Sequence, residues 1–243
     1  MVSEQFKRTA LSLAGCDGGN PASEIWFCGL EHGYDLSEKL DEFLQLPHDK
    51  SPIYSWDHPD CVGDWKYVYN RKICWFLRYF YHLELYHNEN MEALVKRHHI
   101  LYSEQANGIG FKLNMYPLPF KNRSSINWEE NYQKATGFSS FSEYKNWCIE
   151  YRGKYFRALL EKYRPKLIVC TGISEVNNFV RCFTGKDNFT YSNNAEIKIA
   201  YAKFKETLIC VCPFFTNSSG INSYAKMEAL VKDIKEKLND YIN

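Results

Sequence analysis

A short apolar run that ends abruptly at a glycine is the feature that most constrains the fold of this chain. Residues 25–28 read Ile-Trp-Phe-Cys, and Gly29 ends the run. Leu30 comes next, and Glu31, His32 and Gly33 follow it. Apolar runs bounded by turn residues are typical of strands buried on both faces, as in parallel sheets. Open α/β sheets bind their ligands just beyond the carboxyl ends of such strands. The stretch therefore predicts a central strand that delivers the Glu31 carboxylate to a site.

Strand-like and helix-like segments alternate along the rest of the chain. Residues 165–172 are the clearest parallel-strand signal in the chain, and residues 110–116 are strand-like until Pro117. Residues 196–203 and 207–213 predict a hairpin. Apolar residues at helical spacing predict helices over residues 3–14, 36–46, 65–86, 89–99, 141–163, 174–183 and 222–241. This alternation predicts a doubly wound α/β sandwich. Because no repeat or linker interrupts the pattern, a single domain is expected over residues 1–243.

Charge and cysteine content narrow the class of protein. Proteins that bind nucleic acids through their overall charge are strongly basic, whereas this chain has a net charge of only +1. Any nucleic-acid-binding surface must therefore be a local group of basic residues. The nine cysteines form no C-x-x-C pair, so neither a zinc nor an iron–sulfur site is expected. Free cysteines in apolar runs favour the reducing cytoplasm. No signal peptide or membrane span is apparent. We therefore expect a cytoplasmic protein that does not associate with membranes and that uses neither a metal ion nor a cofactor.

Three loops fall at the ends of predicted strands. They are residues 29–34, 114–119 and 217–222. In an open parallel sheet these strand ends gather on one edge, so the three loops are expected to form one site. Together they supply a carboxylate, an amide, and a second amide with hydroxyl groups.

The residues of these loops resemble a known family. Gly29-Leu30-Glu31-His32-Gly33 resembles Gly-x-(Asp/Asn)-Pro-Gly, and residues 217–222, Asn-Ser-Ser-Gly-Ile-Asn, are similar to (His/Asn)-Pro-Ser-x-Leu-Ser. Leu113-Asn114 resembles a strand that carries a base-reading Asn. These are motifs of the uracil-DNA glycosylase superfamily, and the resemblance spans about residues 15–222. It implies a three-layer α/β/α sandwich with a central, mostly parallel four-stranded sheet, a monomeric protein, and DNA as its binding partner.

Three positions depart from the motifs of that family. Glu31 replaces Asp or Asn, and both His32 and Ser218 stand where the family has Pro. The longer acid and the missing prolines imply a pocket for a base other than plain uracil, such as a damaged or bulkier modified pyrimidine.

The chemistry of base release assigns roles to these residues. Cleavage of an N-glycosidic bond builds positive charge on the sugar and negative charge on the departing base. Glu31 can stabilise the sugar and position water, and Asn217 can stabilise the leaving base. Asn114 can form paired hydrogen bonds with a base edge. His32 is a second general acid/base, a phosphate contact or a surface residue.

A base must leave the DNA stack to reach such a pocket. Ile221 is expected to insert into the duplex in its place. An aromatic ring must stack on the flipped base, and Tyr34, Tyr54 and Trp56 are the candidates, the last two in the irregular segment 47–62. Further substrate contacts are expected from the loop residues Gly29, Gly33, Tyr34 and Ser219.

The leading hypothesis is a monofunctional DNA glycosylase-like hydrolase that acts in base excision, either in DNA repair or on foreign modified DNA. The alternative is a catalytically inactive nucleobase- or nucleic-acid-binding module of the same fold. The near-neutral charge also keeps open a hydrolase of small nucleosides or nucleotides. Plainer roles remain open too: Glu31 as a capping or solvated acid, Asn114 as a turn former before Pro117, and residues 217–219 as the cap of the last helix.

Overall fold

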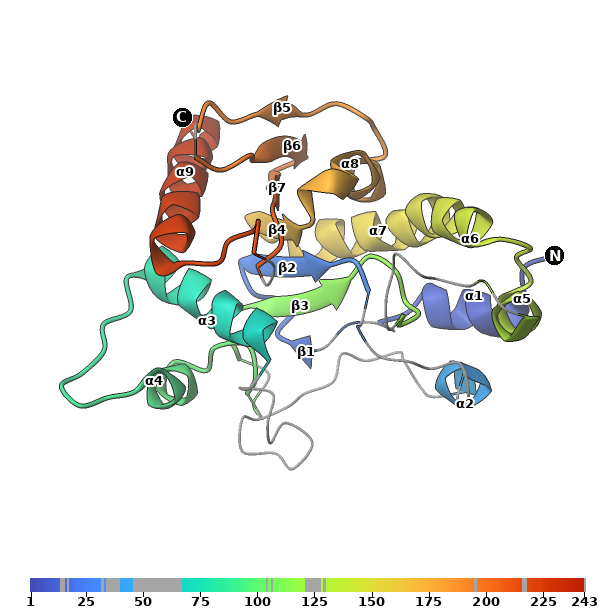
Figure 1. Cartoon of the computed structure of the whole chain (residues 1–243), viewed down its shortest axis with the longest axis horizontal. Helices are drawn as coiled ribbons and strands as arrows, with labels where there is room; N and C mark the ends of the chain where they lie inside the picture. The colour runs from blue at the N-terminus through green and yellow to red at the C-terminus, as the bar shows by residue number, and fades with distance from the viewer. Residues whose placement is uncertain are drawn as a thin grey trace.

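The computed structural model describes residues 1–13, 16, 18–31, 33, 40–45, 67–103, 105, 107–120, 128, 130–194, 196–215 and 218–242. These residues form one mixed sheet of seven strands in the order β1-β3-β2-β4-β7-β6-β5 (Figure 1). The strands are β1 (Gly18–Gly19), β2 (Ile25–Gly29), β3 (Phe111–Asn114), β4 (Leu167–Thr171), β5 (Thr190–Tyr191), β6 (Ala200–Phe204) and β7 (Thr207–Cys212). The four central strands, β3, β2, β4 and β7, are mutually parallel. Antiparallel pairing adds β1 at one edge and the β6–β5 ribbon at the other.

The α/β class is confirmed, but the prediction of a four-stranded, mostly parallel sheet is wrong. The parallel part does contain four strands, and three antiparallel strands extend it among the described residues. The hairpin of β6 and β7 was predicted, but its membership of the main sheet was not. β1 and β5 have two residues each, too few to show the apolar alternation by which strands are recognised.

Helices cover both faces of the sheet. Trp26 and Cys28 of β2 point into one hydrophobic core, whereas Ile25 and Phe27 point into the other. The first core is covered by α1 (Glu4–Ala10), α2 (Leu40–Gln45), α5 (Glu130–Thr136), α6 (Phe141–Trp147), α7 (Gly153–Tyr163) and α8 (Val176–Thr184). The second is covered by α3 (Val68–Tyr81), α4 (Met91–Arg97) and α9 (Tyr224–Ile242). Figure 1 shows α3 and α9 on one side of the sheet and α7 and α8 on the other. None of the described helices combines the length and apolarity that a membrane span requires.

One predicted helix contains a π-helical turn. The helix expected over residues 141–163 consists of α6, a π-helical turn at Cys148–Arg152, and α7. The turn ends at Arg152, whose side chain is fully buried. Its guanidinium donates hydrogen bonds to the carbonyl oxygens of Ala10 (2.6 Å), Ser12 (3.1 Å) and Asn114 (3.3 Å). Arg152 therefore ties the end of α1 to the end of β3 through charge-assisted hydrogen bonds.

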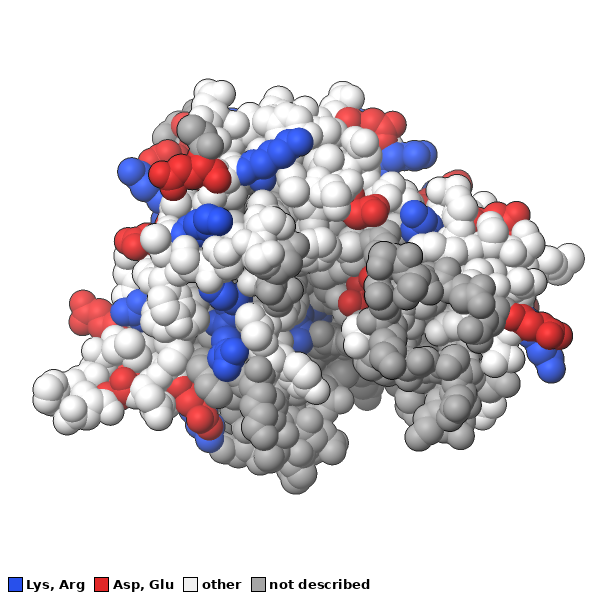
Figure 2. Space-filling model, in the orientation of Figure 1, with Lys and Arg blue, Asp and Glu red and all other residues white. Residues whose placement is uncertain are grey.

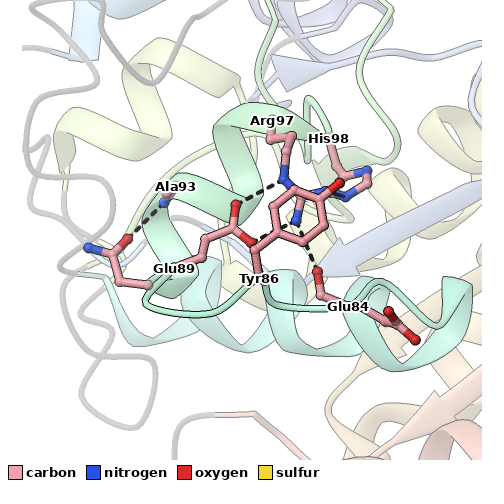
Figure 3. A network of polar contacts seen from close by, with 7 residues as sticks. Glu84, Tyr86, Glu89, Ala93, Arg97 and His98 are labelled. Carbon is pink, nitrogen blue, oxygen red and sulfur yellow. Dashed lines mark hydrogen bonds and ion pairs between the residues drawn. The ribbon is translucent and has the colours of Figure 1, made fainter.

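An arginine-centred network closes the connection between α3 and α4 (Figure 3). Arg97 donates to both carboxylate oxygens of Glu89, at 2.9 and 2.6 Å, and to the carbonyl oxygen of Glu84 at 2.9 Å. Its guanidinium also lies 3.8 Å from the centre of the Tyr86 ring. The hydrogen bonds from Arg97 and then from the Tyr86 backbone lower the pKa of Glu89 to about 2, from an ordinary value of 4.5.

This network predicts a pH-dependent contribution to stability. Because the folded pKa of Glu89 lies below the unfolded value, its ion pair stabilises the protein above about pH 4.5 and loses this effect as the pH falls through 2. Glu89→Gln is therefore expected to lower the urea midpoint at pH 7, and its difference from the wild type should shrink steadily as the pH falls from 4.5 through 2. Glu92→Gln, which removes an exposed pair with Lys96 at 3.7 Å, should change little at either pH. A constant difference between Glu89→Gln and wild type across this range would contradict the assignment.

Candidate functional site

The order of the parallel strands marks the edge of the sheet at which α/β proteins bind their ligands. From β2 the chain crosses to β3 on one side, and it later returns to β4 on the other side of β2. Such a reversal opens a crevice outside the carboxyl ends of the strands, where α/β proteins bind ligands. Gly29 pairs in register with Asn114 at this edge. Beyond the strands, the backbone N–H of Met115 donates to the Gly29 carbonyl (3.0 Å) and that of Tyr116 to the Leu30 carbonyl (2.7 Å).

The side chain of Asn114 lies across Gly29. Asn114 is 5% exposed, and a methyl group added to Gly29 would overlap its Oδ1 atom. The same position on Gly29 lies 3.9 Å from the hydroxyl of Tyr69, a residue of α3. The missing side chain of Gly29 therefore makes the space that the Asn114 amide occupies, on the α3 side of the sheet.

Tyr69 and Thr171 complete this polar group. Thr171, the last residue of β4, donates a hydrogen bond from its hydroxyl to that of Tyr69 at 3.2 Å. Burial raises the pKa of Tyr69 far above its ordinary value of 10, and the hydrogen bond from Thr171 offsets only part of the rise. Tyr69 therefore remains a neutral phenol at physiological pH and keeps its proton as a hydrogen-bond donor. Its ring also packs 5.8 Å from Phe215, in the segment after β7.

A buried lysine lies one layer beneath these groups. Lys112 of β3 is 6% exposed, and its ammonium donates to Oδ1 of Asn70 on α3 at 2.7 Å. The ammonium also lies 6.0 Å from the centre of the Tyr69 ring. Lys112 places positive charge below the crevice. Neither Lys112 nor Tyr69 was predicted, although a lysine inside the strand-like stretch 111–114 was a visible signal.

Glu31 lies directly beyond the end of the central strand, as predicted, and part of its carboxylate is buried. It follows β2 by two residues, and its Oε2 atom is buried from solvent. Burial is the main cause of a raised pKa at Tyr144, and the Glu31 carboxylate adds to the rise. Tyr144 belongs to α6, on the face opposite α3. The structure therefore brings the backbones after β2 and β3 together, and the side chain of Asn114 lies on the α3 side of the sheet.

The segment after β7 borders a pocket at the same edge. Ser219 is exposed and lines a pocket of about 490 Å³. The pocket begins where β4 and β7 end, and its other lining residues are Ile173, Ser174, Glu196, Ile197, Lys198, Pro213, Phe214, Gly220, Ile221 and Lys226. Ser219 thus lies at the predicted edge.

The prediction that Ile221 inserts into DNA is wrong in this structure. Its side chain is 1% exposed and belongs to the core beneath α3 and α9. Its backbone N–H donates to the Phe214 carbonyl at 2.8 Å, which fixes the segment against the sheet. An intercalating wedge must be exposed, whereas Ile221 anchors the segment to the core.

The remaining predicted site residues divide into two groups. Gly33 is exposed, with open space around it. His32, Tyr34 and Asn217 lie outside the described residues, as do Tyr54 and Trp56 of the predicted irregular segment. Among the residues that the structure does describe, no three His, Cys, Asp or Glu side chains gather as a metal site would require. Within the same part of the chain, eight cysteines are buried free thiols.

No family model matches the chain, and no curated protein is significantly similar to it in sequence.

The packing of Asn114 on Gly29 predicts a specific pattern of stability. Gly29→Ala should lower the free energy of unfolding by about 1–3 kcal/mol, because the new methyl group overlaps the Asn114 side chain. Adding Asn114→Ala should recover part of that loss, so that the two changes are not additive. Gly33→Ala, which meets no atom within 4 Å, is the control and should be nearly neutral. Urea unfolding is measured for the wild type, Gly29→Ala, Asn114→Ala, the double variant and Gly33→Ala, and equal stabilities of Gly29→Ala and Gly33→Ala would contradict this packing.

Proposed function

We propose that this protein binds a base flipped out of DNA in the crevice at Asn114 and Gly29, and hydrolyses its N-glycosidic bond. The observation that carries the proposal is the Asn114 amide, held across Gly29 at the point where the strand order reverses. A carboxamide offers both a donor and an acceptor, as paired hydrogen bonds with a base edge require. The neutral hydroxyl of Tyr69 adds a donor beside it.

The reaction requires stabilisation of two opposite charges. Water adds to the anomeric carbon of the sugar, the bond from that carbon to the base nitrogen breaks, and the base leaves with the bonding electrons and then takes up a proton. In the proposal, Glu31 faces the sugar and orients the water. Lys112 supports the negative charge on the base, because a cation in a buried site acts strongly on nearby charge. Asn217 is proposed as a further donor to the base.

A second candidate is a base-binding module without hydrolysis. The burial of Glu31 Oε2 favours it, because a carboxylate oxygen buried from solvent is poorly placed to activate a water molecule. In this candidate, Asn114 still binds the base, but the N-glycosidic bond is not cleaved. In both cases we propose DNA as the binding partner, a monomeric protein, and the reducing cytoplasm as its compartment, which suits eight free thiols.

Two substitutions separate the candidates. Oligonucleotides that carry a panel of modified pyrimidines are incubated with the protein, and abasic sites are revealed by alkaline cleavage. Glu31→Gln should slow base release by about 10²–10⁴-fold while binding survives. Asn114→Ala should weaken binding of the modified oligonucleotide by about 1–3 kcal/mol.

The outcomes discriminate clearly. Binding that depends on Asn114 without any base release, in wild type and Glu31→Gln alike, identifies the binding module. Release of bases from free nucleosides but not from DNA identifies a small-molecule hydrolase. If neither binding nor release depends on Asn114, the assignment of this crevice as a base site is wrong.

A further inference from the structure

A cluster of cations and aromatic rings lies where α3 meets the start of α9. α3 contains Arg71, Lys72 and Arg78 and no acidic residue. The Lys72 ammonium lies 5.4 Å from the centre of the Tyr224 ring, and the Arg78 guanidinium lies 5.1 Å from that of Trp75. The two rings are themselves 4.2 Å apart, so the cluster forms one continuous surface. Figure 2 shows basic side chains over the part of the face that α3 occupies in Figure 1.

The cations of this surface are not paired with acidic residues in the part of the chain that the structure describes. Within the described part of the chain, no Asp or Glu forms an ion pair with Arg71, Lys72, Arg78 or Lys226, whereas Lys154, for example, pairs with Glu150 at 3.6 Å. Burial and the neighbouring Arg71 lower the pKa of Lys72. Cations held together without carboxylates favour an anionic ligand, and phosphate groups neutralise such charges effectively.

The exposed rings indicate which polyanion fits. Tyr67, directly before α3, is 64% exposed, and Tyr224 is 52% exposed. Aromatic rings that stay in solvent beside cations are the elements by which proteins hold single strands, because unpaired bases stack on the rings and phosphates meet the cations. The bases of an intact duplex are already stacked on one another and leave no face for such rings.

The surface is continuous with the proposed base site. Tyr69, whose hydroxyl meets Thr171 at the sheet edge, lies in the first turn of α3. Lys226, in the first turn of α9, lines the pocket that Ser219 and Phe214 border. A strand whose base enters the crevice would therefore leave it directly over α3 and the start of α9.

We propose that Lys72, Trp75, Arg78 and Tyr224 form a docking surface for single-stranded DNA. The inference rests on the proposed function for the choice of DNA, and it extends that function by naming the strand state of the substrate. Tyr224 stacks on an unpaired base, and Lys72 contacts the phosphate next to it.

The chain offers a matched control on the opposite layer. Tyr151 is 43% exposed, and the Lys154 ammonium lies 4.9 Å from the centre of its ring. This pair repeats the exposed tyrosine and its lysine, but it lies at the end of the π-helical turn and in α7, away from the crevice. A non-specific effect of removing a surface tyrosine or lysine would therefore appear in both pairs.

The test measures binding of the full chain to a fluorescent 20-nucleotide oligo-dT by anisotropy, over a range of salt concentrations. Tyr224→Ala should weaken binding by about tenfold. Lys72→Gln should reduce the slope of log affinity against log salt by about 0.7, the value for one phosphate contact on a single strand. Tyr151→Ala and Lys154→Gln should bind as wild type does, and circular dichroism confirms that all four variants are folded.

Three results would overturn the inference: no binding of oligo-dT by the wild type, equal effects in the two pairs, or equal affinity for a duplex of the same length. The base-release assay separates this failure from that of the proposed function. If Tyr224→Ala releases a modified base from single strands as well as wild type does, the docking surface is wrong and the hydrolase stands. If oligo-dT binding depends on Tyr224 and no base is ever released, the surface stands and the hydrolase is wrong.

Discussion

Parallel pairing of β3, β2, β4 and β7 is the constraint on which the rest of this structure depends. Parallel neighbours cannot be joined by tight turns, so each connection must cross a face of the sheet. The crossings cover both faces with helices and bury every residue of β2, β4 and β7. Two hydrophobic cores follow, one on each side. The same pairing brings the carboxyl ends of all four strands to one edge, where polar chemistry can gather.

The polar groups at that edge are held from both layers. Tyr69 reaches the crevice from α3, while Arg152 binds the Asn114 carbonyl from the opposite side. Buried polar groups are costly unless they find hydrogen-bonding groups, and here they find one another or the backbone. Lys112 is the costliest of them to bury because it carries a charge, and its ammonium donates a hydrogen bond to Asn70. Such groups contribute less to stability than apolar residues of similar size would, so their concentration at a strand reversal favours a functional origin.

The crevice and the basic aromatic surface are two parts of one proposal about recognition. The proposed base site offers the neutral phenol of Tyr69 and the amide of Asn114 above the buried cation of Lys112. The surface of α3 and α9 offers cations and exposed rings, a setting suited to the strand on either side of that base. A near-neutral chain therefore carries a local basic face without a high net charge. The two parts can be tested separately, because the base site is tested by base release and the surface by affinity for DNA.

The sequence by itself determined the α/β class, the central strand before Gly29, the position of Asn114 at a strand end and the β6–β7 hairpin. These features depend on local apolar patterns and on turn residues, which can be read along a chain. Only the tertiary structure decided the order of the strands, the inclusion of β1 and β5 in the sheet, the burial of Ile221, and the meeting of Tyr69 with Thr171 across 102 residues. The physical reason is that side-chain direction beyond a strand end and helix docking depend on contacts between distant segments, which no local pattern encodes.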